Sequence, residues 1–157
     1  GRPHRARKEM IASMEKPVII SIKGIQTGET IGEETMELVT QGILGQDQDG
    51  FSLTYEESEL TGLEGTTTTF RIGKDRITLH REGTLRSDMI FQEGQRHFST
   101  YETPYGGLIL GVDTHRARSD IGRSGGDLEI RYALEVDNEK VGENFFEIHV
   151  QEPTALL

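Results

Sequence analysis

The chain of 157 residues contains no cysteine and no tryptophan, and its apolar fraction of 33% is low for a globular protein. Without cysteine the fold has no disulfide, no thiolate metal site and no cysteine nucleophile. No apolar run approaches the roughly 20 residues that a membrane-spanning helix needs, and no signal peptide is evident. These features favour a soluble protein in a reducing, cytoplasmic setting.

Glycine is abundant, whereas proline is scarce: the chain has 19 glycines and 4 prolines. The glycines lie between strand-like runs, which indicates turns and bulges instead of a disordered tract. The length is that of one domain with a substantial core. A low apolar fraction is compatible with β-structure, because a strand with one wet face needs an apolar side chain only at every second position.

Charge divides the chain into two parts. Residues 1–13 contain four basic residues and Glu9, which gives this segment a net charge of +3. Because the whole chain has a net charge of −10, the remaining residues carry −13. We interpret residues 1–13 as a flexible basic extension, an added segment or the product of an early start, and residues 14–157 as the domain. An acidic domain repels phosphate backbones and anionic membranes, so we expect neither nucleic acid nor a membrane as partner.

The clearest structural signal lies at residues 127–136, where apolar and charged side chains alternate. One face carries Leu128, Ile130, Tyr132, Leu134 and Val136. A period of two over ten residues predicts a strand with one buried and one solvated face.

Further strand signals follow one another along the chain. They occupy 17–26, 33–44, 51–60, 66–72, 76–81, 89–91, 96–103, 107–114 and 145–150. Short polar or glycine-containing turns such as 73–75 and 82–83 separate them. We therefore predict an all-β protein with a single closed, antiparallel, up-and-down β-barrel of 8–10 strands, since closure removes exposed edges. At most one helical turn is expected, near 118–121.

Strand parity predicts two charged side chains inside the barrel. Glu57 shares the inward face of its strand with Leu53 and Tyr55, and Arg81 shares the face of Leu79. Burial of each charge alone is costly, whereas the two together can be tolerated as a bidentate pair, so we expect them to approach each other near one end of the barrel. The candidate ligand-binding residues are Tyr55, Glu57, Arg81, Tyr101, Thr103 and Thr114.

This cluster has two interpretations. In the first it is a structural plug, because an eight-stranded barrel has just enough interior for its own side chains. In the second it lines a pocket, in which Arg81 recognises the carboxylate or phosphate of a small ligand.

Several short motifs, in order, resemble the YwiB-like family. They are Tyr55-Glu56-Glu57, the turn and threonine run at 62–69, Arg81-Glu82-Gly83, the segment 101–106, Thr114 and the segment 125–128. The resemblance covers 16–151. It implies a lipocalin-like (calycin) barrel, a bacterial source and a cytoplasmic location, and it brings no catalytic residues.

Motifs of enzyme and metal chemistry are absent from the sequence. The histidines, His4, His80, His97, His115 and His149, form no H-x-H or H-x-x-x-H spacing, and no G-x-S-x-G occurs. We expect no metal and no cofactor. Three hypotheses remain: a binder of a small acidic or amphipathic ligand, a structural or interaction barrel with a filled interior, and, less favoured, an enzyme. Each is compatible with a monomer or a homodimer.

Overall fold

The computed structural model describes residues 14–28 and 32–154; the extension predicted for 1–13 lies outside them. The strands are β1 (Met14–Gly28), β2 (Gly32–Asp47), β3 (Gly50–Glu56), β4 (Thr66–Ile72), β5 (Ile77–Gly83), β6 (Arg86–Phe91), β7 (Arg96–Thr103), β8 (Gly106–Ser119), β9 (Gly125–Val136) and β10 (Glu139–Gln151). A 3-10 helix, η1 (Glu59–Thr61), joins β3 to β4. In the part of the chain described, no helix has the length and apolar character to cross a membrane.

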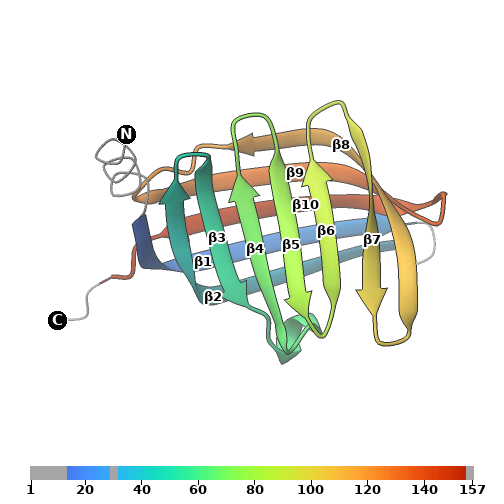
Figure 1. Ribbon diagram of the computed structural model, residues 1–157, viewed down its shortest axis with the longest axis horizontal. Helices are drawn as coiled ribbons and strands as arrows, with labels where there is room; N and C mark the ends of the chain where they lie inside the picture. Colours follow the sequence, from blue (N-terminus) through green and yellow to red (C-terminus); the bar gives the residue numbers. More distant parts are fainter. Residues whose placement is uncertain (1–13, 29–31, 155–157) are drawn as a thin grey trace, which may run out of the picture.

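Each strand pairs antiparallel with its neighbours in the chain, and β1 also pairs with β10, which closes the barrel. The predicted all-β, up-and-down barrel is therefore confirmed, with ten strands among the described residues. Short strands β3–β6 lie in front in Figure 1, and the long strands β8, β9 and β10 cross behind them. The interior lies between these two walls.

Apolar layers fill the interior along β3–β6. One row of directly opposed residues is Phe51, Ile72, Ile77 and Phe91, and the next is Leu53, Phe70, Leu79 and Met89. Strand alternation turns all of them to the same face. Burial of each such side chain stabilises the fold by roughly 1.5–3 kcal/mol. The second layer is the floor of the site described below.

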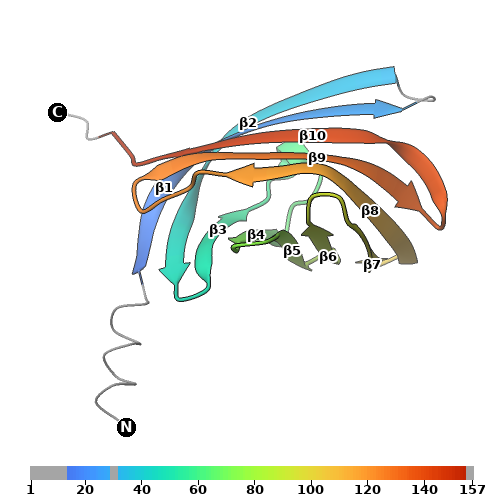
Figure 2. The ribbon, with the colours of Figure 1, turned by 90° about the horizontal axis from the view of Figure 1, so that it is seen from above.

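The barrel wall is incomplete beside β2. The ladder between β2 and β3 begins only at the pair Ile43 and Thr54, whereas the whole of β2 pairs with β1. Among the described residues, the stretch 32–42 thus has a strand neighbour on one side only. Figure 2 shows the β1–β2 hairpin extending beyond the short strands. The interior is accessible where β2 and β3 separate.

The link between β3 and β4 differs from the prediction, because the strand expected at 51–60 ends at Glu56. The Ser58 hydroxyl accepts from the Leu60 N–H at 3.3 Å, and Gly62 ends the helical turn with a φ of 77°. These cap and turn residues favour a helical turn over a continued strand. Near 118–121, where at most one helical turn was predicted, no helical turn forms, and β8 runs through Ser119.

Candidate functional site

A polar row lies directly above the second apolar layer. Its members face one another from β3 to β7: Tyr55, Thr68, Arg81, Ser87 and Tyr101. Each of the four members on β3–β6 lies two residues beyond a member of the apolar layer, so alternation turns it to the interior. The row places hydroxyl groups and one guanidinium at the level where the apolar packing ends.

Glu57 joins this row from just beyond the end of β3. Its N–H donates to the Thr66 carbonyl at 2.9 Å, which continues the ladder by one residue and keeps the side chain turned inward. The side chain is buried, with the residue 8% exposed. The Thr68 hydroxyl donates to Glu57 Oε1 at 2.8 Å, whereas Oε2 is buried without a hydrogen-bond partner.

Glu57 and Arg81 both belong to this polar group, but they do not form a bidentate ion pair. Glu57 Oε2 and Arg81 Nε are both buried without a hydrogen-bond partner. The reason is the register: Thr68 lies directly opposite Arg81 on the neighbouring strand, and its hydroxyl takes the carboxylate oxygen Oε1. The two charged groups therefore share a site without a bidentate contact.

Tyr55 is subject to the electrostatic effect of both charged groups. Burial raises the pKa of its hydroxyl well above the usual value. The negative charge of Glu57 raises this pKa further, and the positive charge of Arg81 opposes the shift. The Tyr55 hydroxyl is therefore a neutral hydrogen-bonding group at physiological pH.

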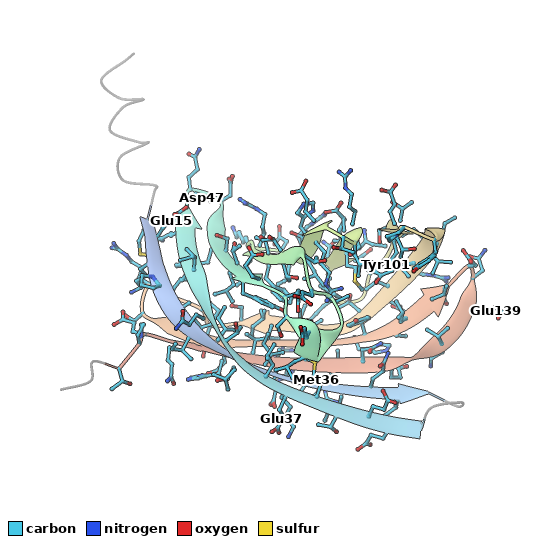
Figure 3. All side chains as sticks on the ribbon, turned by 90° about the horizontal axis from the view of Figure 1, so that it is seen from below. Glu15, Met36, Glu37, Asp47, Tyr101 and Glu139 are labelled. Carbon is cyan, nitrogen blue, oxygen red and sulfur yellow. The ribbon has the colours of Figure 1, made fainter. Side chains whose placement is uncertain are left out.

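Three members of the polar row, together with Glu57, border a cavity of about 490 Å³. Four of the six candidate residues line it, namely Tyr55, Glu57, Arg81 and Tyr101. The facing wall comes from β1, β2, β9 and β10; Figure 3 shows Met36 on β2 and Tyr101 on β7, from opposite walls of the interior. Residues far apart in the sequence thus meet around one space.

The structure places the other two candidates apart from this lining. The Thr103 hydroxyl donates to the Gly106 carbonyl at 3.0 Å and accepts from the Tyr105 N–H at 3.1 Å, so it shapes the β7–β8 turn. Thr114 is 1% exposed and lies opposite Tyr132 on β8 and β9. A ligand contact by either threonine stays a prediction.

Comparison with known proteins places the chain in a family. A domain of unknown function, DUF1934, matches residues 20–148. The chain belongs to this family. The crystal structure of the ywiB protein from Bacillus subtilis is similar, with a TM-score of 0.81 and 21% identity over 92% of this chain and 98% of that chain. The resemblance to the YwiB-like family is thereby confirmed, and the likeness at this identity shows the shared fold. None of the curated proteins matches the chain.

Asn144 and Tyr132 of this DUF1934 domain also line the cavity and were not among the candidates. Asn144 borders the cavity, and its Nδ2 is buried without a hydrogen-bond partner. Tyr132 packs against Phe91 with ring centroids 4.9 Å apart, and burial raises the pKa of Tyr132 to about 12. Tyr132 was recognised as inward from its alternation. Asn144 shares its parity with Phe146, but the strand was expected to begin only at 145.

The described part of this DUF1934 domain holds no cluster of side chains that could bind a metal ion. Across residues 14–28 and 32–154, no three His, Asp or Glu side chains are placed to hold a metal ion. The cavity lining offers the charged groups Glu34, Glu57 and Arg81, the amide of Asn144 and tyrosine hydroxyls for hydrogen bonding and charge recognition.

Proposed function

We propose that this DUF1934 domain binds a small acidic or amphipathic ligand inside its barrel. The observation that carries the proposal is that Glu57 and Arg81 line the same cavity, while Glu57 Oε2 and Arg81 Nε are buried without a hydrogen-bond partner. A buried polar group without a partner costs about 1–3 kcal/mol, and a ligand that bonds to both groups offsets that cost. The cavity volume of about 490 Å³ falls within the range of known ligand pockets.

The distribution of polarity supports an amphipathic ligand. Tyr55 and Glu57, deep in the cavity, are 7% and 8% exposed, whereas Met36 and Leu108 are 37% and 41% exposed although they also line it. The exposed part of the lining thus carries these apolar side chains beside the polar Gln26, Glu34 and Thr35, and the buried part carries Tyr55 and Glu57 above the apolar Phe70 and Met89. A ligand with a polar head and an apolar body can contact both kinds of group, with its head beside Tyr55 and Glu57.

A thermal-shift screen of the purified protein with single-chain amphiphiles and small organic acids tests the proposal. A ligand at 100 times its Kd stabilises the folded state by about 2.7 kcal/mol, so a true ligand raises the Tm in proportion to the logarithm of its concentration. Arg81→Met should abolish this shift. Arg76→Met, which removes an exposed arginine outside the cavity lining, is the matched control and should keep it.

The competing interpretation is a structural plug, and the same variants separate the two. A plug predicts that Arg81→Met lowers the Tm of the ligand-free protein while no compound raises the Tm of the wild type. A binding site predicts loss of the ligand-induced shift. The bacterial, cytoplasmic setting and a monomeric or homodimeric state belong to this proposal; the similar structure comes from a bacterium.

A further inference from the structure

The head-binding end of the cavity offers both an acceptor and a donor of opposite charge. Glu57 Oε2 is an acceptor, Arg81 Nε is a donor, and both are buried without a hydrogen-bond partner. Their charges act in opposite directions on the pKa of the Tyr55 hydroxyl, so both lie within electrostatic reach of one point. A ligand head at this point encounters a negative and a positive group together.

This arrangement discriminates among head groups. A simple carboxylate can accept from Arg81, but it brings a second negative charge next to Glu57, and like charges in a buried site oppose each other. A simple ammonium group has the converse problem beside Arg81. A head that carries a donor and an acceptor can satisfy Glu57 and Arg81 at once with charge-assisted hydrogen bonds.

A third buried group, which is a hydrogen-bond donor, also requires an acceptor from the ligand. Asn144, on β10, lines the same cavity, and its Nδ2 is buried without a hydrogen-bond partner. The two oxygens of a carboxylate can accept from Arg81 and Asn144, while a neighbouring ammonium donates to Glu57. The unpartnered groups thus match a carboxylate and an ammonium on adjacent atoms.

Beyond the head-binding end, apolar side chains line the cavity together with the polar Gln26, Glu34 and Thr35. Leu38, Leu134 and Val136 border the cavity together with the more exposed Met36 and Leu108. These side chains can cover an aliphatic or aromatic body that extends toward the mouth. A head without such a body would leave this apolar surface in water.

Building on the proposed function, we propose that the ligand class is the zwitterionic α-amino acid with a long apolar side chain. Its ammonium binds Glu57, its carboxylate binds Arg81 and Asn144, and its side chain lies along the apolar lining. The specificity arises from charge pairing at the head, and chain length contributes affinity.

A matched series of probes tests the assignment by isothermal titration calorimetry near neutral pH on the full chain. The probes are α-aminodecanoic acid, decanoic acid and decylamine, which have a saturated ten-carbon chain in common and differ in the charge of the head. The α-amino acid should bind about tenfold or more tightly than either singly charged probe, the ratio expected from one additional charge-assisted hydrogen bond.

Two variants test which charged residue is responsible for the preference among the three probes. Glu57→Gln should weaken α-aminodecanoic acid and strengthen decanoic acid, because the repelling carboxylate is gone. Arg81→Met should weaken both acids and spare decylamine. Melting curves of the ligand-free variants report whether they fold; if either variant fails to fold, the probe series on the wild-type protein decides alone.

The outcomes separate this inference from the broader one. Equal or tighter binding of decanoic acid or decylamine overturns the zwitterionic head but leaves a ligand-binding barrel in place. If none of the three probes binds, the head assignment is overturned, and the broader thermal-shift screen decides independently whether the barrel binds any ligand.

Discussion

Thr68 donates a hydrogen bond of 2.8 Å to Oε1 of Glu57 inside the barrel, across the β3–β4 boundary. One residue earlier on each strand, Thr67 makes the same bond to Glu56 Oε1 at 2.8 Å on the exposed outer face. The two threonine–glutamate pairs have the same chemistry and differ in burial. Comparing the two pairs within one protein therefore shows how burial changes the contribution of a threonine–glutamate hydrogen bond to stability.

Thr68→Val should lower the free energy of unfolding by about 1–3 kcal/mol, because it leaves the buried Glu57 carboxylate without its hydroxyl donor. The matched change Thr67→Val should cost less than about 0.5 kcal/mol, since water replaces the lost donor on the outer face. Urea denaturation of both variants measures the difference. Equal effects at the two positions would contradict a buried, threonine-held carboxylate.

Strand periodicity carried most of the information that the sequence contained about the interior. A period of two predicts the face of each side chain, and Tyr55, Glu57 and Arg81 do line the cavity. Parity does not predict the level of a side chain along the barrel, which depends on the register between strands. Thr114 is buried as its parity implies, yet it is not part of the lining.

Register also decides which polar groups meet. The β3–β4 register sets Thr68 opposite Tyr55, and the β4–β5 register sets it opposite Arg81. Parity alone placed Glu57 and Arg81 on one face, but it did not show that the Thr68 hydroxyl donates to Glu57 Oε1. Asn144 was missed for a related reason, because β10 begins at Glu139, before the apolar alternation starts.

Gly83, at the end of β5, should not tolerate a side chain. Its φ is +132°, a conformation that L-residues rarely adopt, and a Cβ there would clash with the Gly65 carbonyl oxygen. Gly83→Ala should therefore destabilise the fold by about 1–3 kcal/mol. Gly107→Ala is the control, because a Cβ at Gly107 meets no atom closer than 3.9 Å. Chemical denaturation of the two variants should rank them in this order.

His80 should titrate above its ordinary range on the outer face of β5. Its Nδ1 lies 2.6 Å from Asp88 Oδ1, and this hydrogen bond is the main cause that raises the pKa of His80. The associated stability is present below the ordinary value of 6.5 and is lost as pH rises through the raised pKa. NMR titration of the His80 ring should show a lower midpoint in Asp88→Asn. Asp75→Asn removes an equal charge in the β4–β5 turn and should leave the midpoint in place.

Tyr132 should make the folded state lose stability in alkaline solution. Burial raises its pKa from 10.0 to about 12, so between these values the unfolded chain releases a proton that the folded protein keeps. The free energy of unfolding then falls by about 1.4 kcal/mol per pH unit from this one group.

Denaturation at a series of pH values should show a shallower loss of stability for Tyr132→Phe than for the wild type. From about pH 7 to 9 both proteins should have the same slope, because Tyr132 keeps its proton in both states. A wild-type loss above pH 10 that Tyr132→Phe reproduces in full would rule out this tyrosine as the source.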